Sequence, residues 1–125
     1  RRLDEFLELV PSSMRFAVEL RDPSWIHDDV FDVLRRRSVA LCIHDLLPSH
    51  PFELTADWTY VRFHGPDAIA KPYHGAYGES GLQPWIDRLQ PVIDAGRDVY
   101  AYFNNDWYGH AVNDAMLLRR ALHPA

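Results

Sequence analysis

Two different spacings of apolar residues divide this chain into strands and helices. Four stretches predict strands, at residues 16–20, 39–44, 58–64 and 99–103. In the third stretch, Thr59, Val61 and Phe63 alternate with Tyr60 and Arg62, which places the two sets on opposite faces of a sheet. The stretch at 39–44 is nearly all apolar, as expected of a strand that is buried on both faces.

Helical periodicity fills most of the intervals between these strands. Apolar residues three and four positions apart predict helices over residues 3–10 and 25–37, with two more after residues 80 and 105. Ser80 and Gln83 have the spacing of a capping box, which predicts that the third helix begins there. The last helix is expected to bury an apolar stripe made of Ala111, Ala115, Leu118 and Leu122.

The order of these elements predicts the fold class. Strands that alternate with helices indicate an α/β fold with a parallel sheet, and 125 residues are expected to form a single segment of structure. The second and third strands are joined by a proline-containing loop at 46–53, and the third is followed by a loop at 67–80. Loops as long as the latter are uncommon in compact domains and are often functional.

Charge and cysteine content narrow the classes of function. The net charge of −5 argues against general binding to nucleic acid, which usually needs a basic face, although it leaves room for a local basic pocket. Cys42 is the only cysteine, so no internal disulfide forms, which fits a cytoplasmic protein. No apolar run approaches the ~20 residues that a membrane helix needs. Because the sequence lacks a starting Met and opens in helical periodicity, we expect a segment of a longer protein.

Polar side chains gather at the ends of all four predicted strands. The carboxyl ends of parallel strands meet at one edge of the sheet, which is where sites form in such folds. The residues in question are Glu19, Arg21, His44, Asp45, Arg62, His64, Asn104 and Asn105.

Glu19, Arg21 and Arg62 are predicted to share one face. They could form a buried ion-pair network that fixes the strand order, or a clamp for a phosphate or carboxylate, for which arginine is suited. Asn104 and Asn105 allow a similar choice, between turn and cap chemistry and the orientation of a bound substrate.

The histidines also allow several interpretations. His44, Asp45, His64 and Glu19 together could bind a metal ion, but the chain has no HExxH, HxH or CxxC spacing, so we assign no metal ligand and no cofactor. Structural hydrogen bonding is the simpler interpretation. A third is acid–base catalysis, in which His64 and Glu19 are the candidate catalytic residues, since an imidazole pKa of ~6.5 suits proton transfer.

The loop at 67–80 is rich in aromatic residues and glycine. Tyr73, His74 and Tyr77, with Gly75 and Gly78, could form a mobile lid whose rings stack on a sugar or a base, or a loop that simply covers the end of the sheet. Together with Arg21, Arg62, Asn104 and Asn105, we take Tyr73 and Tyr77 as candidate substrate-binding residues.

Several runs of sequence resemble one known family. They are residues 18–25 (VELRDPSW), 55–57 (TAD), 60–66 (YVRFHGP), Tyr73-x-Gly75-x-Tyr77, Leu82 with Trp85, and 103–106 (FNND) followed by Gly109 and Ala111. In this order they are similar to the YecE-like family, also called domain of unknown function 72, across nearly the whole chain. Two positions depart from the family pattern: Asp114, where members usually have Asn, and His44, where members vary.

The resemblance implies a TIM-like (β/α)8 barrel about twice as long as this chain. The segment resembles its C-terminal half, strands five to eight, and the N-terminal half has no counterpart here. The family has no settled activity. Its barrel is similar in outline to those of apurinic-site endonucleases and sugar isomerases, which is an analogy of fold only.

Two functions follow as hypotheses. The first is a hydrolase or isomerase that acts on a phosphate- or sugar-containing substrate at the barrel mouth; a nucleic-acid substrate is compatible with the fold but not favoured by the charge. The second is a non-catalytic ligand-binding or regulatory barrel whose polar network is structural. In either case, an isolated half-barrel leaves sheet edges unpaired, so we expect it to pair with the missing N-terminal half or to self-associate.

Overall fold

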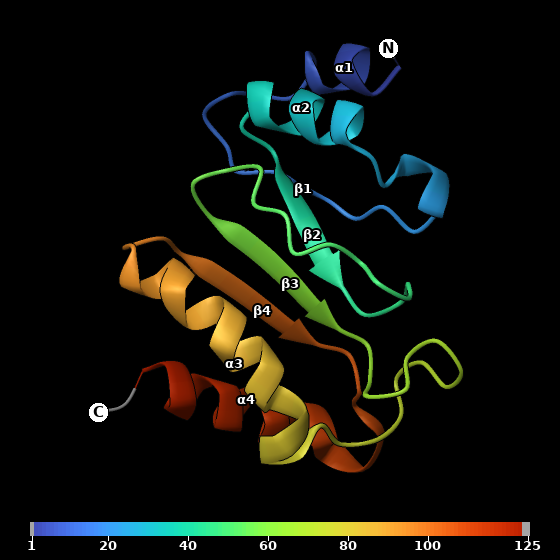
Figure 1. The fold of residues 1–125 in the computed structure, drawn as a ribbon, viewed down its shortest axis with the longest axis vertical. Helices are drawn as coiled ribbons and strands as arrows, with labels where there is room; N and C mark the ends of the chain where they lie inside the picture. The colour runs from blue at the N-terminus through green and yellow to red at the C-terminus, as the bar shows by residue number, and fades with distance from the viewer. Residues whose placement is uncertain (1, 124–125) are drawn as a thin grey trace.

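Four parallel strands form a single sheet in the computed structural model, which describes residues 2–123. The strands β1 (Ala17–Val18), β2 (Ala40–His44), β3 (Thr59–Phe63) and β4 (Val99–Phe103) lie side by side in sequence order (Figure 1). The predicted α/β fold with a parallel sheet is therefore confirmed. The first strand is shorter than predicted.

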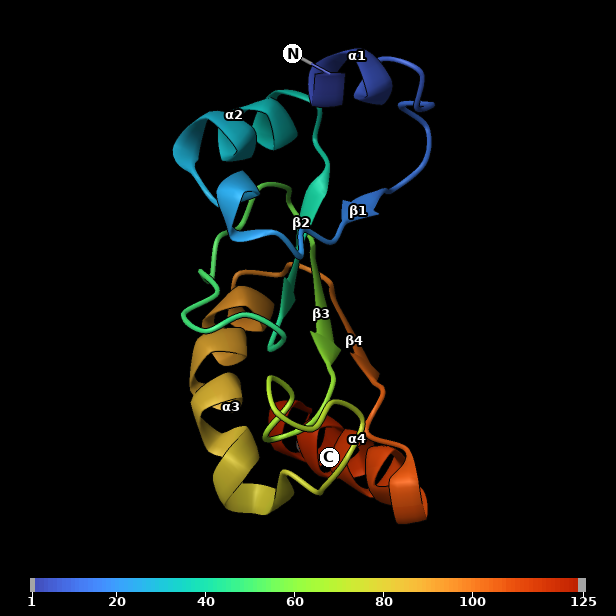
Figure 2. The ribbon, with the colours of Figure 1, turned by 90° about the vertical axis from the view of Figure 1, so that its right-hand side faces the viewer.

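The helices lie beside the sheet in two groups (Figure 2). At one end, α1 (Arg2–Leu7) and α2 (Asp28–Arg36) pack beside β1 and the start of β2, and at the other, α3 (Gly78–Asp94) and α4 (His110–Leu122) cover β3 and β4. Two 3-10 helices, η1 (Pro23–Trp25) and η2 (Trp107–Gly109), follow β1 and β4. No helix within residues 2–123 is long and apolar enough to cross a membrane.

Two helices begin at different residues from those predicted. The helix predicted from residue 25 begins at Asp28, because Asp22 caps a separate 3-10 turn by accepting a hydrogen bond from Ser24 N at 2.9 Å. The helix predicted at the Ser80 capping box begins at Gly78 instead. Its first backbone donors are satisfied by Asp114, which lies on α4.

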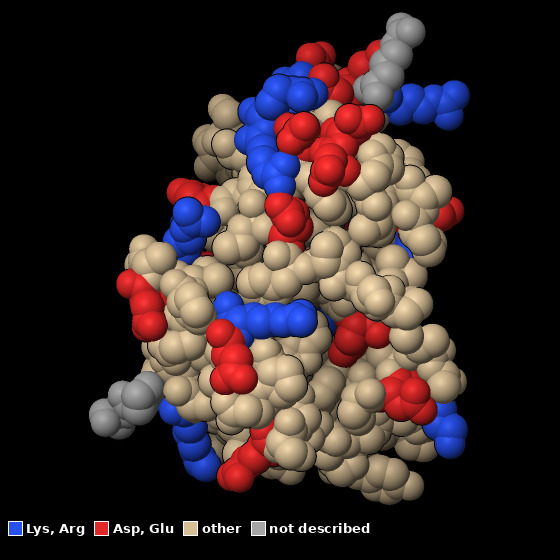
Figure 3. Space-filling model, viewed as in Figure 1, with Lys and Arg blue, Asp and Glu red and all other residues tan. Residues whose placement is uncertain are grey.

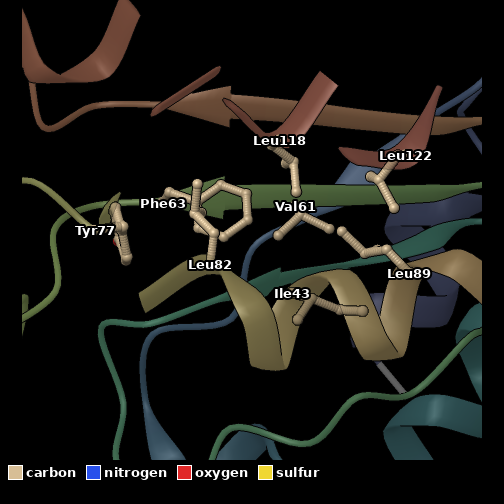
Figure 4. Close-up of a cluster of buried hydrophobic side chains, with 8 residues drawn as sticks. All are labelled: Ile43, Val61, Phe63, Tyr77, Leu82, Leu89, Leu118 and Leu122. Carbon is tan, nitrogen blue, oxygen red and sulfur yellow. The ribbon is translucent and has the colours of Figure 1, made fainter. Parts of the chain in front are cut away.

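The larger core fills the space between the sheet and α3 and α4. Every second residue of β3 and β4 points into it, which confirms the alternation predicted for these strands. In Figure 4 these side chains meet those of the two helices; the buried members are Ile43, Val61, Phe63, Tyr77, Leu82, Leu89, Leu118 and Leu122. A second cluster joins α1 and α2 to β1 and β2, and its buried members are Leu7, Leu20, Val30, Phe31, Leu34, Val39 and Leu41.

Charged side chains are of mixed sign on the side of the molecule shown in Figure 3. Over α1 and α2, Arg37 donates hydrogen bonds to Asp4 at 2.7 Å and to Glu8 at 2.6 Å. Lys and Arg are interspersed with Asp and Glu, and no broad basic surface is visible on this side. This distribution gives no support to a polyanion-binding face there.

The opposite face of the sheet, called the inner face, carries Tyr60, Arg62, Tyr100 and Tyr102. Arg62 pairs in register with His44 on one side and Tyr102 on the other. Tyr100 is 41% exposed and Tyr102 is 49% exposed, although Tyr60 and Tyr102 stack with ring centroids 5.0 Å apart. Exposed aromatic rings grouped on one face are typical of interaction surfaces in other proteins.

We predict that the isolated 125-residue chain self-associates or binds a complementary half-barrel. β1 and β4 are the outer strands of the sheet, and exposed edges and an aromatic inner face favour association. Sedimentation equilibrium at micromolar concentration checks this expectation. A folded monomer that stays monomeric as its concentration is raised tenfold would contradict it.

Candidate functional site

Four side chains meet on the inner face at the carboxyl ends of the strands. Glu19 and Arg21 follow β1, Arg62 lies in β3, and Asn104 follows β4. Glu19 Oε1 accepts a hydrogen bond from Arg21 Nε at 2.5 Å, and Glu19 Oε2 accepts one from Arg62 Nη1 at 2.7 Å. Arg62 also donates to Asn104 Oδ1, from Nε at 3.2 Å and from Nη2 at 3.1 Å. We call these four residues the clamp.

The clamp has hydrogen-bond donors to spare. Arginine carries five N–H donors, and the bonds within residues 2–123 use three from Arg62 and one from Arg21. Two therefore remain on Arg62 and four on Arg21. The Arg21 side chain is 57% exposed, so it is open to solvent. Two guanidinium groups that share one carboxylate also leave a local excess of positive charge.

Glu19 is the residue that holds the two guanidinium groups together. Burial raises the pKa of Glu19, but the hydrogen bonds from Arg21 and Arg62 outweigh it, and the pKa is lowered overall. A carboxylate in this setting is ionised at neutral pH. Its hydrogen bonds suit a residue that positions the two arginines better than one that donates a proton. Its predicted acid–base role stays a prediction.

A second cluster lies between the end of β2 and the end of β3. Asp45 Oδ1 accepts hydrogen bonds from His64 N at 2.9 Å and from His64 Nδ1 at 3.2 Å. Its other oxygen, Oδ2, accepts a short hydrogen bond from the Tyr77 hydroxyl. The same hydroxyl oxygen accepts a hydrogen bond from Gly65 N at 2.7 Å. These bonds hold the imidazole of His64 in one orientation.

The bond to Asp45 fixes which nitrogen of His64 is basic. Because Nδ1 donates a hydrogen bond to Asp45, it carries the ring proton, and the lone pair is on Nε2. Nε2 is buried without a hydrogen-bond partner among the described residues. Burial lowers the pKa of His64, with Arg62 acting in the same direction and Asp45 opposing both. The ring is therefore neutral at pH 7 and can accept a proton at Nε2.

The arrangement of the histidines does not form the metal site considered from the sequence. His44 donates from Nε2 to Leu20 O at 2.8 Å and accepts at Nδ1 from Leu46 N at 3.2 Å, so both ring nitrogens are used. Within residues 2–123, no group of three or more His, Cys, Asp or Glu side chains is placed to hold a metal ion. His44 accordingly has a structural role.

The remaining predicted site residues occupy two different settings. Tyr73 is 42% exposed, and its ring centroid lies 6.0 Å from that of His64. Tyr77, predicted as part of a mobile lid, is buried in the core at the start of α3. Asn105 is also buried, and its amide donates to Gly75 O and to Asp114 Oδ2, both at 2.8 Å. The structure thus places Tyr77 and Asn105 beneath the site, where they support it.

Asp114 and Gly65 are supporting residues whose structural roles the sequence analysis did not predict. Asp114 accepts hydrogen bonds from Tyr77 N and Gly78 N at 3.0 Å each, in addition to the one from Asn105. Gly65 has a φ of 137°, and a Cβ there would lie 2.6 Å from His74 O. The Asp114 contacts join segments that are 36 and 37 positions apart in sequence, whereas the Gly65 constraint lies within the loop after β3. The sequence analysis grouped Asp45 and His64 as possible metal ligands or structural hydrogen-bonding residues, and the structure joins them directly by hydrogen bonds.

The histidines predict that the folded state loses stability in acid. Burial, with nearby His44, lowers the pKa of His50 from 6.5 to about 4, and burial lowers that of His64 as well. In the unfolded chain both histidines bind a proton with a pKa of about 6.5, whereas in the folded state they stay neutral to lower pH. The unfolding free energy should therefore be highest above pH 6.5 and fall by about 1–3 kcal/mol towards pH 4. Urea titrations across this range check it, with His50→Phe giving a shallower slope. A stability that is constant between pH 6.5 and 5 would contradict it.

Four parallel strands with helices beside them, and polar side chains gathered at the carboxyl ends of the strands, define half of an α/β barrel. The whole chain, residues 1–125, matches the family model described as "Protein of unknown function DUF72", and the protein belongs to that family.

Solved structures of the same family have a similar fold. A DUF72 family protein from Thermotoga maritima has a TM-score of 0.82 and 25% sequence identity, and the match covers 96% of this chain and 50% of that one. A second, from Enterococcus faecalis, has a TM-score of 0.76 and 19% identity, covering 99% and 51%. The chain therefore spans about half the length of these relatives; its assignment to strands five to eight stays a prediction. No protein with a curated description matches it.

Proposed function

We propose that the clamp binds the anionic group of a phosphate-containing substrate, and that His64 acts on that substrate as a general base in a hydrolysis or an isomerisation. The observation that carries the proposal is the sharing of Glu19 by Arg21 and Arg62, which leaves unused guanidinium donors on the inner face. Arginine forks match the geometry of phosphate and carboxylate oxygens, which supports an anionic ligand.

The chemistry proposed for His64 follows from its hydrogen bonds. Asp45 holds the ring and stabilises the positive charge that forms when Nε2 accepts a proton, which is the arrangement of many acid–base histidines. Arg62 lies in β3 and His64 follows two residues later at the end of the same strand, so the clamp and the base are neighbours in the chain. A proton taken from a bound water would give hydrolysis, and one taken from a carbon next to a carbonyl would give isomerisation.

A non-catalytic ligand-binding barrel is the second candidate, and one observation favours it. His64 is completely buried in this conformation, with Tyr73 close to its ring, so a substrate reaches Nε2 only if the loop after β3 moves. This candidate predicts anion binding without turnover. The single Cys42 fits the further proposal that either function operates in the reducing cytoplasm.

Turnover by the full gene product separates the two candidates. We expect hydrolysis or isomerisation within a panel of phosphomonoesters and aldose and ketose phosphates. The rate should fall in acid as His64, whose pKa is lowered by burial, becomes protonated. His64→Gln should reduce kcat by about 100-fold or more while ligand binding persists. His50→Gln, which alters another histidine with a buried unpaired Nε2, is the matched control and should change kcat little. Binding without turnover across the panel would favour the non-catalytic barrel.

A further inference from the structure

Exposed aromatic rings follow the clamp residue Asn104 along the chain, just beyond β4. Trp107 and Tyr108 follow Asn104 by three and four residues, and they are 52% and 88% exposed. One face of Trp107 stacks on His74, with ring centroids 4.2 Å apart and an interplanar angle of 27°. Tyr108 stands at 64° to Trp107, with centroids 6.2 Å apart. The planes of the two rings are therefore steeply inclined to each other, and both rings are exposed to solvent.

The backbone that presents these rings is strained. Tyr108 has a φ of 56° and Tyr73 a φ of 73°, which is the left-handed region that bulky residues avoid. Strain of this kind persists only where the surrounding structure holds it, and it clusters at binding and catalytic sites. Here Asn105 donates to Gly75 O and so ties the loop after β3 to the start of the turn after β4. Figures 1 and 2 show these two loops side by side beyond the strand ends.

Two chain segments connect the rings to the clamp and to the cluster around His64. The ring centroid of Tyr73 lies 6.0 Å from that of His64, and the next residue, His74, stacks on Trp107, so the loop after β3 contacts both the His64 cluster and the exposed rings. On the other side, the chain runs from Asn104 of the clamp through Asp106 to Trp107. A ligand whose anion is held by the arginines would extend over these rings.

We propose that Tyr73, Trp107 and Tyr108 form a platform that stacks on the sugar ring of the substrate whose anionic group the clamp holds. This inference rests on the proposed function and names its substrate as a sugar phosphate. Aromatic faces pack against the apolar C–H faces of sugars, while Asp106 and His110 beside the rings offer hydrogen-bond partners for hydroxyl groups. The net charge of −5 argues against a polyanionic nucleic acid as the ligand.

Isothermal titration calorimetry of the full gene product tests the platform. The probes are inorganic phosphate, glucose 6-phosphate and adenosine monophosphate. We expect glucose 6-phosphate to bind at least tenfold more tightly than inorganic phosphate, and Trp107→Ala and Tyr108→Ala to remove most of that difference. The affinity for inorganic phosphate should stay unchanged in both variants, which also shows that they fold. Phe6→Ala, which removes another exposed aromatic ring on α1, is the matched control and should change neither affinity.

Each other result counts against a specific part of this account. If inorganic phosphate binds but glucose 6-phosphate binds no better, or if Trp107→Ala leaves the difference intact, the platform is overturned and the clamp stands. A gain seen only with adenosine monophosphate also overturns it, because the rings would then stack on a base. If none of the three probes binds, the proposed function is contradicted, and the platform is contradicted with it.

Discussion

Replacing Arg62 with methionine is expected to weaken the binding of inorganic phosphate by about 10- to 100-fold. Arg62 contributes two unused donors and a full positive charge to the clamp, and hydrogen bonds to charged groups are worth about 1.5–3 kcal/mol each. Arg62→Lys should fall between the wild type and Arg62→Met, because lysine keeps the charge but lacks the planar fork. Calorimetric titration of the full gene product with phosphate gives these affinities directly.

Arg88→Met is the matched control for this experiment. Arg88 lies on α3, where its guanidinium sits 5.9 Å from the ring of Phe52, and it has no part in the clamp. The Arg88→Met substitution removes the same charge from the protein as Arg62→Met and should leave the affinity for phosphate unchanged. Equal weakening by Arg88→Met and Arg62→Met would mean that net charge, not the clamp, determines binding. Unchanged binding in Arg62→Met would remove the clamp as an anion site.

Asp114→Ala is expected to destabilise the folded state by about 3 kcal/mol or more. Asp114 is 1% exposed, and its carboxylate accepts hydrogen bonds from two backbone amides at the start of α3 and from the Asn105 amide. Truncation leaves these buried donors without partners, at about 1–3 kcal/mol each, and removes a negative charge from a helix N-terminus. Asp114→Asn should cost less, since its amide oxygen still accepts hydrogen bonds. Denaturant unfolding measures both.

An exposed aspartate on α3 provides the comparison for Asp114. Asp87 accepts a hydrogen bond only from Gln83 at 2.8 Å among its described contacts, one helical turn away. Its replacement by alanine should change the unfolding free energy by less than about 0.5 kcal/mol. An equally small effect of Asp114→Ala on the unfolding free energy would mean that Asp114 does not support the loop after β3, which carries Tyr73 and His74.

Strand positions and faces could be predicted because they depend on local alternation. The spacing of Tyr60, Val61, Arg62 and Phe63 was enough to place Arg62 on the inner face and Phe63 in the core. The carboxyl-end rule then brought Glu19, Arg21, Arg62 and Asn104 to the same edge, and the structure joins these four through hydrogen bonds. Such rules need only the order of the strands and their direction.

The supports of the site could not be predicted in this way. Asp114 caps a helix whose first residue is 36 positions earlier, so the local Ser80–Gln83 pattern indicated a start two residues too late. Tyr77 looked like a lid residue because it lies in a glycine-rich loop, but its hydroxyl bonds inward to Asp45. Tertiary hydrogen bonds between distant segments leave no periodic trace in the sequence.

The clamp is tested most directly by the position of a heavy anion in a crystal of the full gene product. Tungstate has the shape and charge of phosphate, and its anomalous scattering locates it without ambiguity. The account predicts a tungstate ion on the inner face, within hydrogen-bond distance of both Arg21 and Arg62, that disappears in Arg62→Met. Tungstate bound elsewhere, with no ion between these two guanidinium groups, would contradict it.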